Sequence, residues 1–131
     1  MAAEKILIVE DHGFMRQLLA SRLKASSYDV IMGADGNEGL SKALQETPDL
    51  IILDINLPGM SGLKLGALLK ADPQTRSIPI IFVSARGEGE DVFKAISQIG
   101  AECYILKPFT SEKLIEEIKK ALNKYKTLKK R

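Results

Sequence analysis

Residues 50–54 read Leu-Ile-Ile-Leu-Asp, a run of four large apolar residues that ends on a carboxylate. A short, continuous apolar run of this kind is typical of a strand that is buried on both faces of a parallel sheet. In the run 78–83, Pro79 weakens the start of the predicted strand, because proline has no backbone N–H to donate. Four other runs are predicted as strands: 5–9, 29–34, 78–83 and 103–106.

Apolar residues at helical spacing separate these strands. Pro48 and the pair Asp72-Pro73 mark where two of the helices end. Strands that alternate with helices imply a parallel sheet with helices on both faces, which is an α/β fold. The predicted helices are 14–25, a helix around 40–44 that Pro48 ends, 63–70, 90–99 and 110–125.

The length and composition fit one soluble domain, with the domain expected at residues 1–125 and a basic tail at 126–131. A chain of 131 residues is long enough to bury a core of its own. The formal charge of +2 is too small to argue for direct nucleic-acid binding, although residues 112–131 hold eight basic and three acidic side chains. Because no apolar stretch approaches the ~20 residues of a membrane span, we expect no membrane partner and a cytoplasmic location.

Polar residues follow the carboxyl ends of four of the predicted strands. Glu10 and Asp11 follow the first, Asp54 the third, Ser84 the fourth and Lys107 the fifth. Ligands of open α/β sheets bind outside the carboxyl ends of the strands, so these side chains are expected to share one crevice. Three carboxylates, a hydroxyl and an ammonium suit a divalent metal and a phosphoryl group.

The chemistry of such a crevice favours Mg²⁺, which prefers oxygen ligands and often binds one or two carboxylates plus a phosphate. Asp11 and Asp54 suit direct ligation, and the longer Glu10 suits contact through water. A carboxylate can also attack phosphorus to give an acyl phosphate, and Asp54 is the better candidate for that role. The metal and Lys107 would neutralise charge while Ser84 donates a hydrogen bond to a phosphoryl oxygen.

Four separated motifs carry a resemblance to a known family. They are Val9-Glu10-Asp11, the stretch 53–62 (Leu-Asp-Ile-Asn-Leu-Pro-Gly-Met-Ser-Gly), Val83-Ser84-Ala85 and the stretch 104–109 (Tyr-Ile-Leu-Lys-Pro-Phe). In this order and at these strand ends, they resemble the bacterial two-component response-regulator receiver domain. The resemblance runs from about Lys5 to Leu122.

The resemblance implies a flavodoxin-like (βα)5 doubly wound fold with strand order 2-1-3-4-5. It implies Asp54 as phosphoacceptor, and Mg²⁺ held by Asp11, Asp54 and the backbone carbonyl of Asn56 with Glu10 as an outer acid. It also implies Lys107 as the phosphate-binding cation, before a cis bond to Pro108. Asn56 and Arg86 occupy positions that tune the lifetime of the phosphoryl group in this family.

The same resemblance implies a switch rather than a substrate-converting enzyme, with self-phosphorylation and auto-dephosphorylation at Asp54 only. The donor would be a phosphohistidine on a sensor histidine kinase or a phosphotransfer protein. Ser84 would move to meet the phosphoryl group, Tyr104 would turn inward, and the surface formed by 90–99, 103–106 and 110–125 would change its affinity for a downstream protein. The domain would be a monomer or a phosphorylation-linked dimer.

Two other classes of protein fit the sequence less well than a receiver does. A haloacid-dehalogenase-like phosphatase would want an acid two residues after its nucleophile, where this chain has Asn56. A flavin-binding protein of this fold would want a Ser/Thr/Gly-rich loop where this chain has Glu10 and Asp11. His12 is expected to be exposed rather than a ligand, and Tyr104 could equally serve packing. The chain is either a stand-alone regulator or a receiver from a longer protein with an output domain after residue 131.

Overall fold

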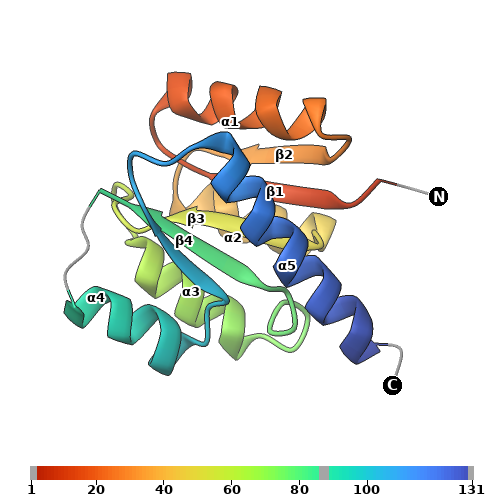
Figure 1. Ribbon diagram of the computed structural model, residues 1–131. Helices are drawn as coiled ribbons and strands as arrows, with labels where there is room; N and C mark the ends of the chain where they lie inside the picture. The colour runs from red at the N-terminus through yellow and green to blue at the C-terminus, as the bar shows by residue number, and fades with distance from the viewer. Residues whose placement is uncertain (1–2, 86–88, 130–131) are drawn as a thin grey trace.

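Parallel strands form a sheet of five in the order β2-β1-β3-β4-β5 in the computed structural model, which describes residues 3–85 and 89–129 (Figure 1). This arrangement confirms the predicted α/β fold and the strand order implied by the resemblance. The strands are β1 (Lys5–Val9), β2 (Asp29–Gly33), β3 (Leu50–Asp54), β4 (Ile80–Ser84) and β5 (Cys103–Leu106).

Helices cover both faces of the sheet. Helices α1 and α5 lie on one face, and α2, α3 and α4 lie on the other (Figure 1). Among the described residues no helix is both long enough and apolar enough to cross a membrane. The helices are α1 (Gly13–Ala25), α2 (Gly36–Glu46), α3 (Gly62–Ala71), α4 (Gly89–Phe93), the π-helix η1 (Lys94–Ile99) that continues α4, and α5 (Ser111–Lys129).

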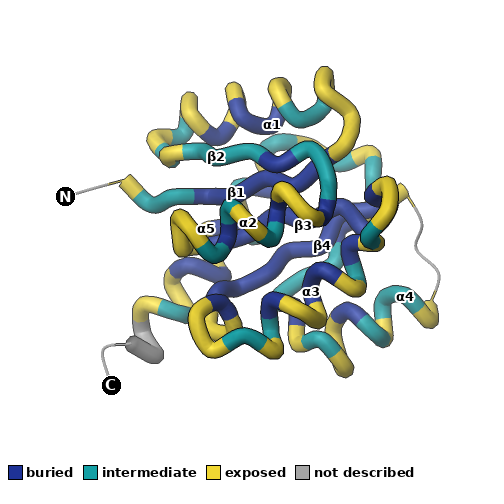
Figure 2. The backbone as a smooth tube through the Cα atoms, turned by 180° about the vertical axis from the view of Figure 1, so that it is seen from behind, coloured by how far each residue is buried: buried dark blue, intermediate teal, exposed yellow. Residues whose placement is uncertain are grey.

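Alternate residues of each central strand enter two separate hydrophobic clusters. In β3, for example, Leu50 and Ile52 pack towards α1 and α5, whereas Ile51 and Leu53 pack towards α2 and α3. All four are fully buried, as expected for a parallel sheet covered on both faces. Figure 2 shows the same pattern, with buried strands at the centre and exposed residues on the outer sides of the helices.

Several predicted elements differ from those of the structure, and three of the differences have a bearing on the fold. Strand β4 begins at Ile80 rather than at residue 78, because Pro79 cannot donate to the ladder and only its carbonyl is used, by the backbone N–H of Ile51 at 3.0 Å. The predicted helix 90–99 changes from α to π geometry at Lys94. Helix α5 continues to Lys129, four residues past the predicted end.

The strand register places the candidate site at one edge of the sheet. Asp54 is the last residue of β3 and pairs with Val83, and Ser84 is the last residue of β4 and pairs with Leu106. The connection after β3 is fixed closely, because the N–H of Gly62 donates to the carbonyl of Ile55 at 2.8 Å. A Cβ atom on Gly62 would overlap the backbone carbonyl of Asp54, so only glycine lets α3 begin directly beside Asp54.

Candidate functional site

Lys107 connects two buried carboxylates at the carboxyl edge of the sheet. Its Nζ atom donates to Glu10 Oε1 at 2.7 Å and to Asp54 Oδ2 at 2.8 Å. Glu10 follows β1, Asp54 ends β3 and Lys107 follows β5, so three strands each supply one member. Glu10 is 1% exposed and Asp54 is 3% exposed, so neither carboxylate is solvated on its own. The ammonium therefore compensates part of the charge that these buried carboxylates carry.

Burial and pairing act in opposite directions on these groups. Burial raises the pKa of the Glu10 carboxyl above its ordinary value, and the hydrogen bond from Lys107 offsets only part of that shift. Burial alone would lower the pKa of Lys107, but the hydrogen bonds to Asp54 and Glu10 outweigh it and the pKa is raised. Lys107 is thus firmly held in its cationic form, whereas ionised Glu10 carries a desolvation cost.

A chain of hydrogen bonds links Asp54 to Ser84. The backbone N–H of Asn56 donates to Asp54 Oδ1 at 2.9 Å, and the side-chain amide of Asn56 donates to Ser84 Oγ at 3.3 Å. Ser84 is fully buried, and its carbonyl accepts from the backbone N–H of Lys107 at 2.8 Å. The predicted residues Asp54, Asn56, Ser84 and Lys107 therefore lie together in one network.

Asp11 and His12 lie on the solvent side of this network. Ligand atoms of Glu10, Asp11 and His12 all lie within 4.8 Å of one another. The His12 side chain is 76% exposed, as predicted, with Nδ1 3.5 Å from Asp11 Oδ1. Asp54 is not part of this cluster and is connected to it through the ammonium of Lys107, which lies between Asp54 and Glu10.

The residues present fit a magnesium ion by their chemistry. Glu10, Asp11 and Asp54 offer carboxylate oxygens, which Mg²⁺ prefers, and together with Lys107 they leave a formal excess of negative charge. Each Asp54 oxygen accepts one described hydrogen bond and keeps a further lone pair. The donor set is therefore suited to a hard divalent cation.

The chain matches the family model of the response regulator receiver domain over residues 6–119.

The chain belongs to this receiver family.

Known relatives of this receiver include both long and short proteins. The phosphate regulon transcriptional regulatory protein PhoB of Klebsiella pneumoniae is 36% identical over 122 residues, which are 93% of this chain and 53% of PhoB. The polar-differentiation response regulator DivK of Brucella anthropi is 39% identical over 122 residues, which are 91% of this chain and 96% of DivK. The chain thus spans about half the length of PhoB and nearly all of DivK.

Solved structures agree with the fold described above. A CheY-like response regulator receiver domain protein from Methanospirillum hungatei has a TM-score of 0.89 at 30% identity, covering 95% of this chain and 98% of that one. The chemotaxis protein CheY4 of Vibrio cholerae has a TM-score of 0.86 at 30% identity, covering 92% of this chain and 99% of CheY4. Receiver domains are signalling modules of two-component systems that generally bind Mg²⁺ at an acidic pocket.

Two further residues were predicted to tune or report the receiver's state. Tyr104 in β5 is partly buried and packs against the cluster that contains Phe82 and Ala95. Its role as a switch stays a prediction. Arg86 lies outside the described residues.

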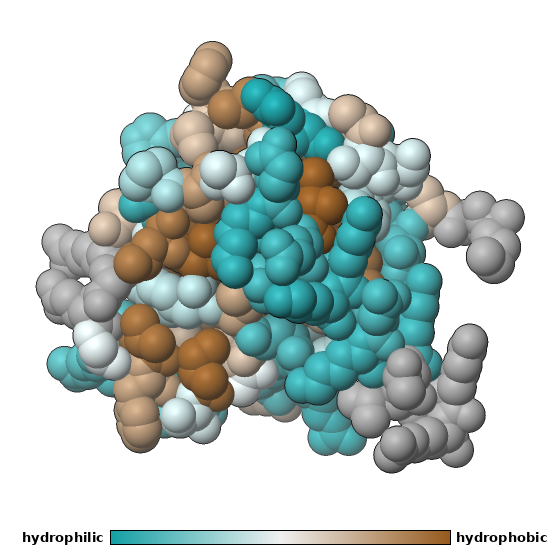
Figure 3. Space-filling view, viewed as in Figure 1, coloured by the Kyte–Doolittle hydropathy of each residue, from teal (hydrophilic) through white to brown (hydrophobic). Residues whose placement is uncertain are grey.

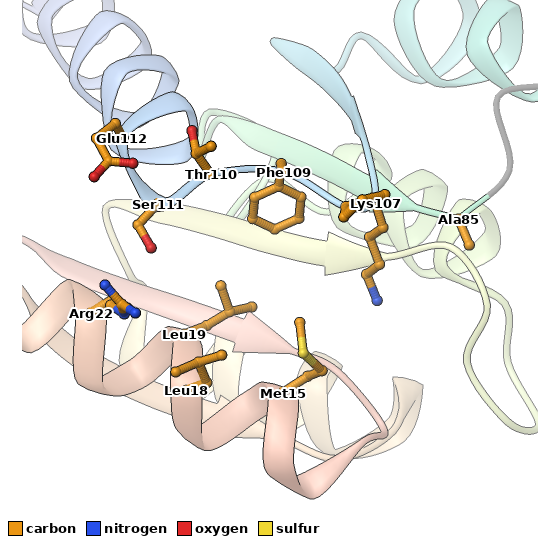
Figure 4. Close-up of a pocket in the computed structure, with 11 residues that line it drawn as sticks. Met15, Leu18, Leu19, Arg22, Ala85, Lys107, Phe109, Thr110, Ser111 and Glu112 are labelled. Carbon is orange, nitrogen blue, oxygen red and sulfur yellow. The ribbon is translucent and has the colours of Figure 1, made fainter.

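Sequence reasoning missed two features beside the site. Arg16 on α1 donates to the carbonyls of the acidic pair, and an arginine in the first turn of the helix after that pair was the available signal. A groove of about 700 Å³ separates α1 from the segment between β5 and α5 (Figure 4). Its apolar lining includes Met15, Leu18 and Phe109, and Lys107 lies at one end. Only the three-dimensional arrangement brings these two segments together.

Proposed function

We propose that the chain is a phosphorylation-dependent switch in which Asp54 accepts a phosphoryl group from a phosphohistidine. The observation that carries the proposal is the pairing of the buried Asp54 carboxylate with the Lys107 ammonium at the open edge of the sheet. Response regulators receive phosphoryl groups from histidine kinases and act on downstream partners. A histidine kinase or a histidine phosphotransfer protein is therefore the donor proposed here.

The proposed transfer is an in-line displacement at phosphorus. A carboxylate oxygen of Asp54 forms the new P–O bond while the P–N bond to the donor imidazole breaks, and the imidazole nitrogen keeps the bonding electrons. Lys107 already contacts this carboxylate at 2.8 Å, so its ammonium can follow the charge onto a phosphoryl oxygen. Hydrolysis by water later returns Asp54 to the carboxylate. The domain itself converts no other substrate.

The magnesium site proposed for this reaction uses Asp11, Asp54 and the backbone carbonyl of Asn56, with Glu10 acting through water. When bound, Mg²⁺ would neutralise phosphoryl oxygens during transfer. Glu10 has the longer side chain, which suits contact through a metal-bound water, and its oxygens accept from Lys107 at 2.7 Å and from the N–H of His12 at 3.3 Å. Asp11 is the exposed carboxylate of the pair and is accessible to an incoming ion.

The groove between α1 and the β5–α5 segment supports a docking place for the donor. A donor histidine must approach Asp54 from the open edge of the sheet, and the groove ends there at Lys107 (Figure 4). Leu18 lines the groove and is 37% exposed, so a donor helix would gain apolar burial against it. We place the donor contact at this groove.

The output surface is proposed to be α4, β5 and α5. Phosphorylation would add about −1.5 to −2 charges and three acceptor oxygens, and Ser84 would turn towards them. Tyr104, one strand away, would then move inward. Phe93, Ile96 and Leu106 on this surface are 40–57% exposed, and Figure 3 shows hydrophobic side chains gathered over α4 while hydrophilic ones cover α5. Such exposed apolar residues favour a protein partner over nucleic acid.

The two kinds of relatives suggest two ways in which the receiver is used. A DivK-like protein of nearly the same length would act through protein contacts alone, whereas a PhoB-like protein would place this receiver ahead of an output domain. Both uses share the same phosphorylation chemistry. Monomeric and phosphorylation-linked dimeric forms are both compatible with the proposed output surface.

Intact-mass spectrometry after incubation with acetyl phosphate and Mg²⁺ tests the proposal. We expect a gain of one phosphoryl group that disappears in Asp54→Asn and in EDTA. Asp49→Asn is the matched control, because Asp49 is exposed at the opposite edge of the sheet, where it accepts from the N–H of Lys5. Loss of the gain in the Asp49 variant, or its survival in Asp54→Asn, would contradict the proposed acceptor.

A further inference from the structure

Arg16 reaches back from helix α1 to the loop that carries the acidic pair. Its Nη1 atom lies 2.7 Å from the backbone carbonyl of Glu10 and 3.4 Å from that of Asp11. Its backbone N–H donates to the carbonyl of His12 at 2.9 Å. One residue in the first turn of α1 therefore contacts all three residues of the connection between β1 and α1.

This connection lacks the side-chain cap that other helices of the domain use. Asp35 caps α2 by accepting from the N–H of Glu38, and Ser61 caps α3 by accepting from the N–H of Lys64. His12 precedes α1 without a side-chain hydrogen bond to the helix, and the first turn of α1 has no acidic residue. The guanidinium of Arg16 thus holds a loop that no N-cap side chain fixes.

The position of the Asp11 carboxylate depends on the backbone more than that of the Glu10 carboxylate does. The carboxylate of Glu10 is anchored by Lys107 and by the N–H of His12. Among the described residues, the polar neighbour of the Asp11 carboxylate is the ring of His12, whose Nδ1 lies 3.5 Å from Asp11 Oδ1. That ring is itself 76% exposed. The direction of the Asp11 side chain is therefore set mainly by the peptide groups on either side of it, and Arg16 donates to the carbonyls of both.

Arg16 has two opposite effects on Mg²⁺ binding, one through its charge and one through the position in which it holds the acidic pair. The positive charge of Arg16 repels a nearby divalent cation, so its electrostatic effect alone would weaken Mg²⁺ binding. A charge-assisted bond to the carbonyls of Glu10 and Asp11 would instead favour binding, by holding the acidic pair in one arrangement. The sign of the change on removing Arg16 distinguishes these two effects.

We propose that Arg16 is a positioning residue for the magnesium site, acting through the backbone of Glu10 and Asp11 rather than touching metal or phosphoryl group. This inference rests on the proposed function, because it assumes that Asp11 binds Mg²⁺. Arg16 sets the affinity for the ion and leaves the phosphoryl transfer step itself unchanged.

Isothermal titration of Mg²⁺ into the whole chain tests the inference. For Arg16→Gln we expect the dissociation constant to rise about tenfold, at the lower end of the 10–100-fold cost of removing a supporting partner of a metal ligand. Arg16→Lys keeps the charge but not the forked geometry and should fall between wild type and Arg16→Gln. Lys24→Gln, which removes one positive charge from the exposed last turn of α1, should bind Mg²⁺ like wild type.

Phosphorylation by acetyl phosphate supplies a second readout. The Mg²⁺ concentration for half-maximal rate should rise in Arg16→Gln by the same factor as the dissociation constant. The rate at saturating Mg²⁺ should change less than about twofold, since the loss is of ion binding rather than of transfer. A merely structural role would lower the melting temperature in EDTA and leave both Mg²⁺ values unchanged.

The outcomes separate this inference from the proposed function. If wild type neither binds Mg²⁺ nor accepts phosphate, the proposed function fails and the inference fails with it. If wild type does both while Arg16→Gln binds Mg²⁺ equally or more tightly, only the positioning role is overturned. Should Arg16→Gln not fold, Arg16→Lys decides: weaker binding than wild type supports the role, and equal binding overturns it.

Discussion

The Nζ atom of Lys107 lies 2.8 Å from Oδ2 of Asp54, so the residue proposed to accept the phosphoryl group is paired with the residue proposed to stabilise it. The same ammonium reaches Glu10 at 2.7 Å. Two buried carboxylates therefore share one cation, which compensates part of their negative charge before any phosphoryl group arrives. The stability of the domain and its chemistry should consequently depend on the same lysine.

Replacing Lys107 with Met should destabilise the domain strongly. Removing one partner of a buried ion pair leaves uncompensated charge, which costs about 3 kcal/mol or more in the free energy of unfolding. Lys113→Met is the control, because Lys113 is 53% exposed in a surface pair with Glu117 and such a pair is worth about 0.3–0.5 kcal/mol. Urea unfolding in EDTA measures both, and equal small losses would show that Lys107 has no special structural role.

Glu10 should make stability depend on pH in a particular direction. Burial raises the pKa of Glu10 in the folded protein above the ordinary 4.5, so the folded state holds its proton more tightly than the unfolded state does. The stability that this proton contributes is fully present below pH 4.5 and is lost as the pH rises through the folded pKa. The free energy of unfolding of Glu10→Gln should therefore increase relative to that of wild type as the pH rises from 4 to 7.

Urea unfolding at several pH values in EDTA checks this dependence. Glu46→Gln is the control, since Glu46 lies in an exposed pair with Lys5 that is worth only about 0–1 kcal/mol. If the free energy of unfolding of Glu10→Gln instead fell relative to that of wild type as the pH rose, the raised pKa would be contradicted.

Two glycines that each begin a helix should respond oppositely to alanine. A Cβ atom at Gly62 would overlap the Asp54 carbonyl, and relieving such an overlap typically costs about 1–3 kcal/mol while displacing Asp54. At Gly13 the nearest atom to a Cβ is Nη2 of Arg16 at 3.7 Å, an ordinary contact. Gly13→Ala should be neutral or stabilising by about 0.4–1 kcal/mol. Thermal unfolding compares the two, and equal tolerance would show that α3 can move away from Asp54.

Leu18 should matter for transfer from a protein donor but not from a small one. Leu18→Ser removes an apolar contact from the groove beside Lys107, and a loss of about 1.4 kcal/mol corresponds to a tenfold slower transfer. The donor is a purified histidine phosphotransfer protein that loads wild type, and acetyl phosphate serves as the comparison. Leu68→Ser is the matched control, at 39% exposure on α3 across the sheet. Equal slowing by both variants, or slowing with acetyl phosphate, would count against docking at the groove.

Most of the fold and of the site could be predicted from the apolar runs of the strands and from the residues at the strand ends. The apolar run 50–53 and its acid predicted a buried strand and a crevice residue, because burial on both faces demands large apolar side chains throughout. Features that depend on the meeting of distant segments could not be predicted in this way. The groove beside α1 exists only because the segment between β5 and α5 lies against that helix. The bonds from Arg16 to Glu10 and Asp11 are local, but they depend on the conformation of the loop, which apolar periodicity does not reveal. The π geometry after Phe93 has no local signal that periodicity detects.

Chemical trapping of the acceptor tests the central claim most directly. After phosphorylation with acetyl phosphate and Mg²⁺, borohydride reduces an aspartyl phosphate to homoserine, and peptide mass spectrometry then locates it. We predict homoserine at position 54 and unmodified residues at Glu10, Asp11 and His12. A phosphoryl group or its reduction product at one of those three residues, with Asp54 unchanged, would contradict the assignment of Asp54 as the acceptor.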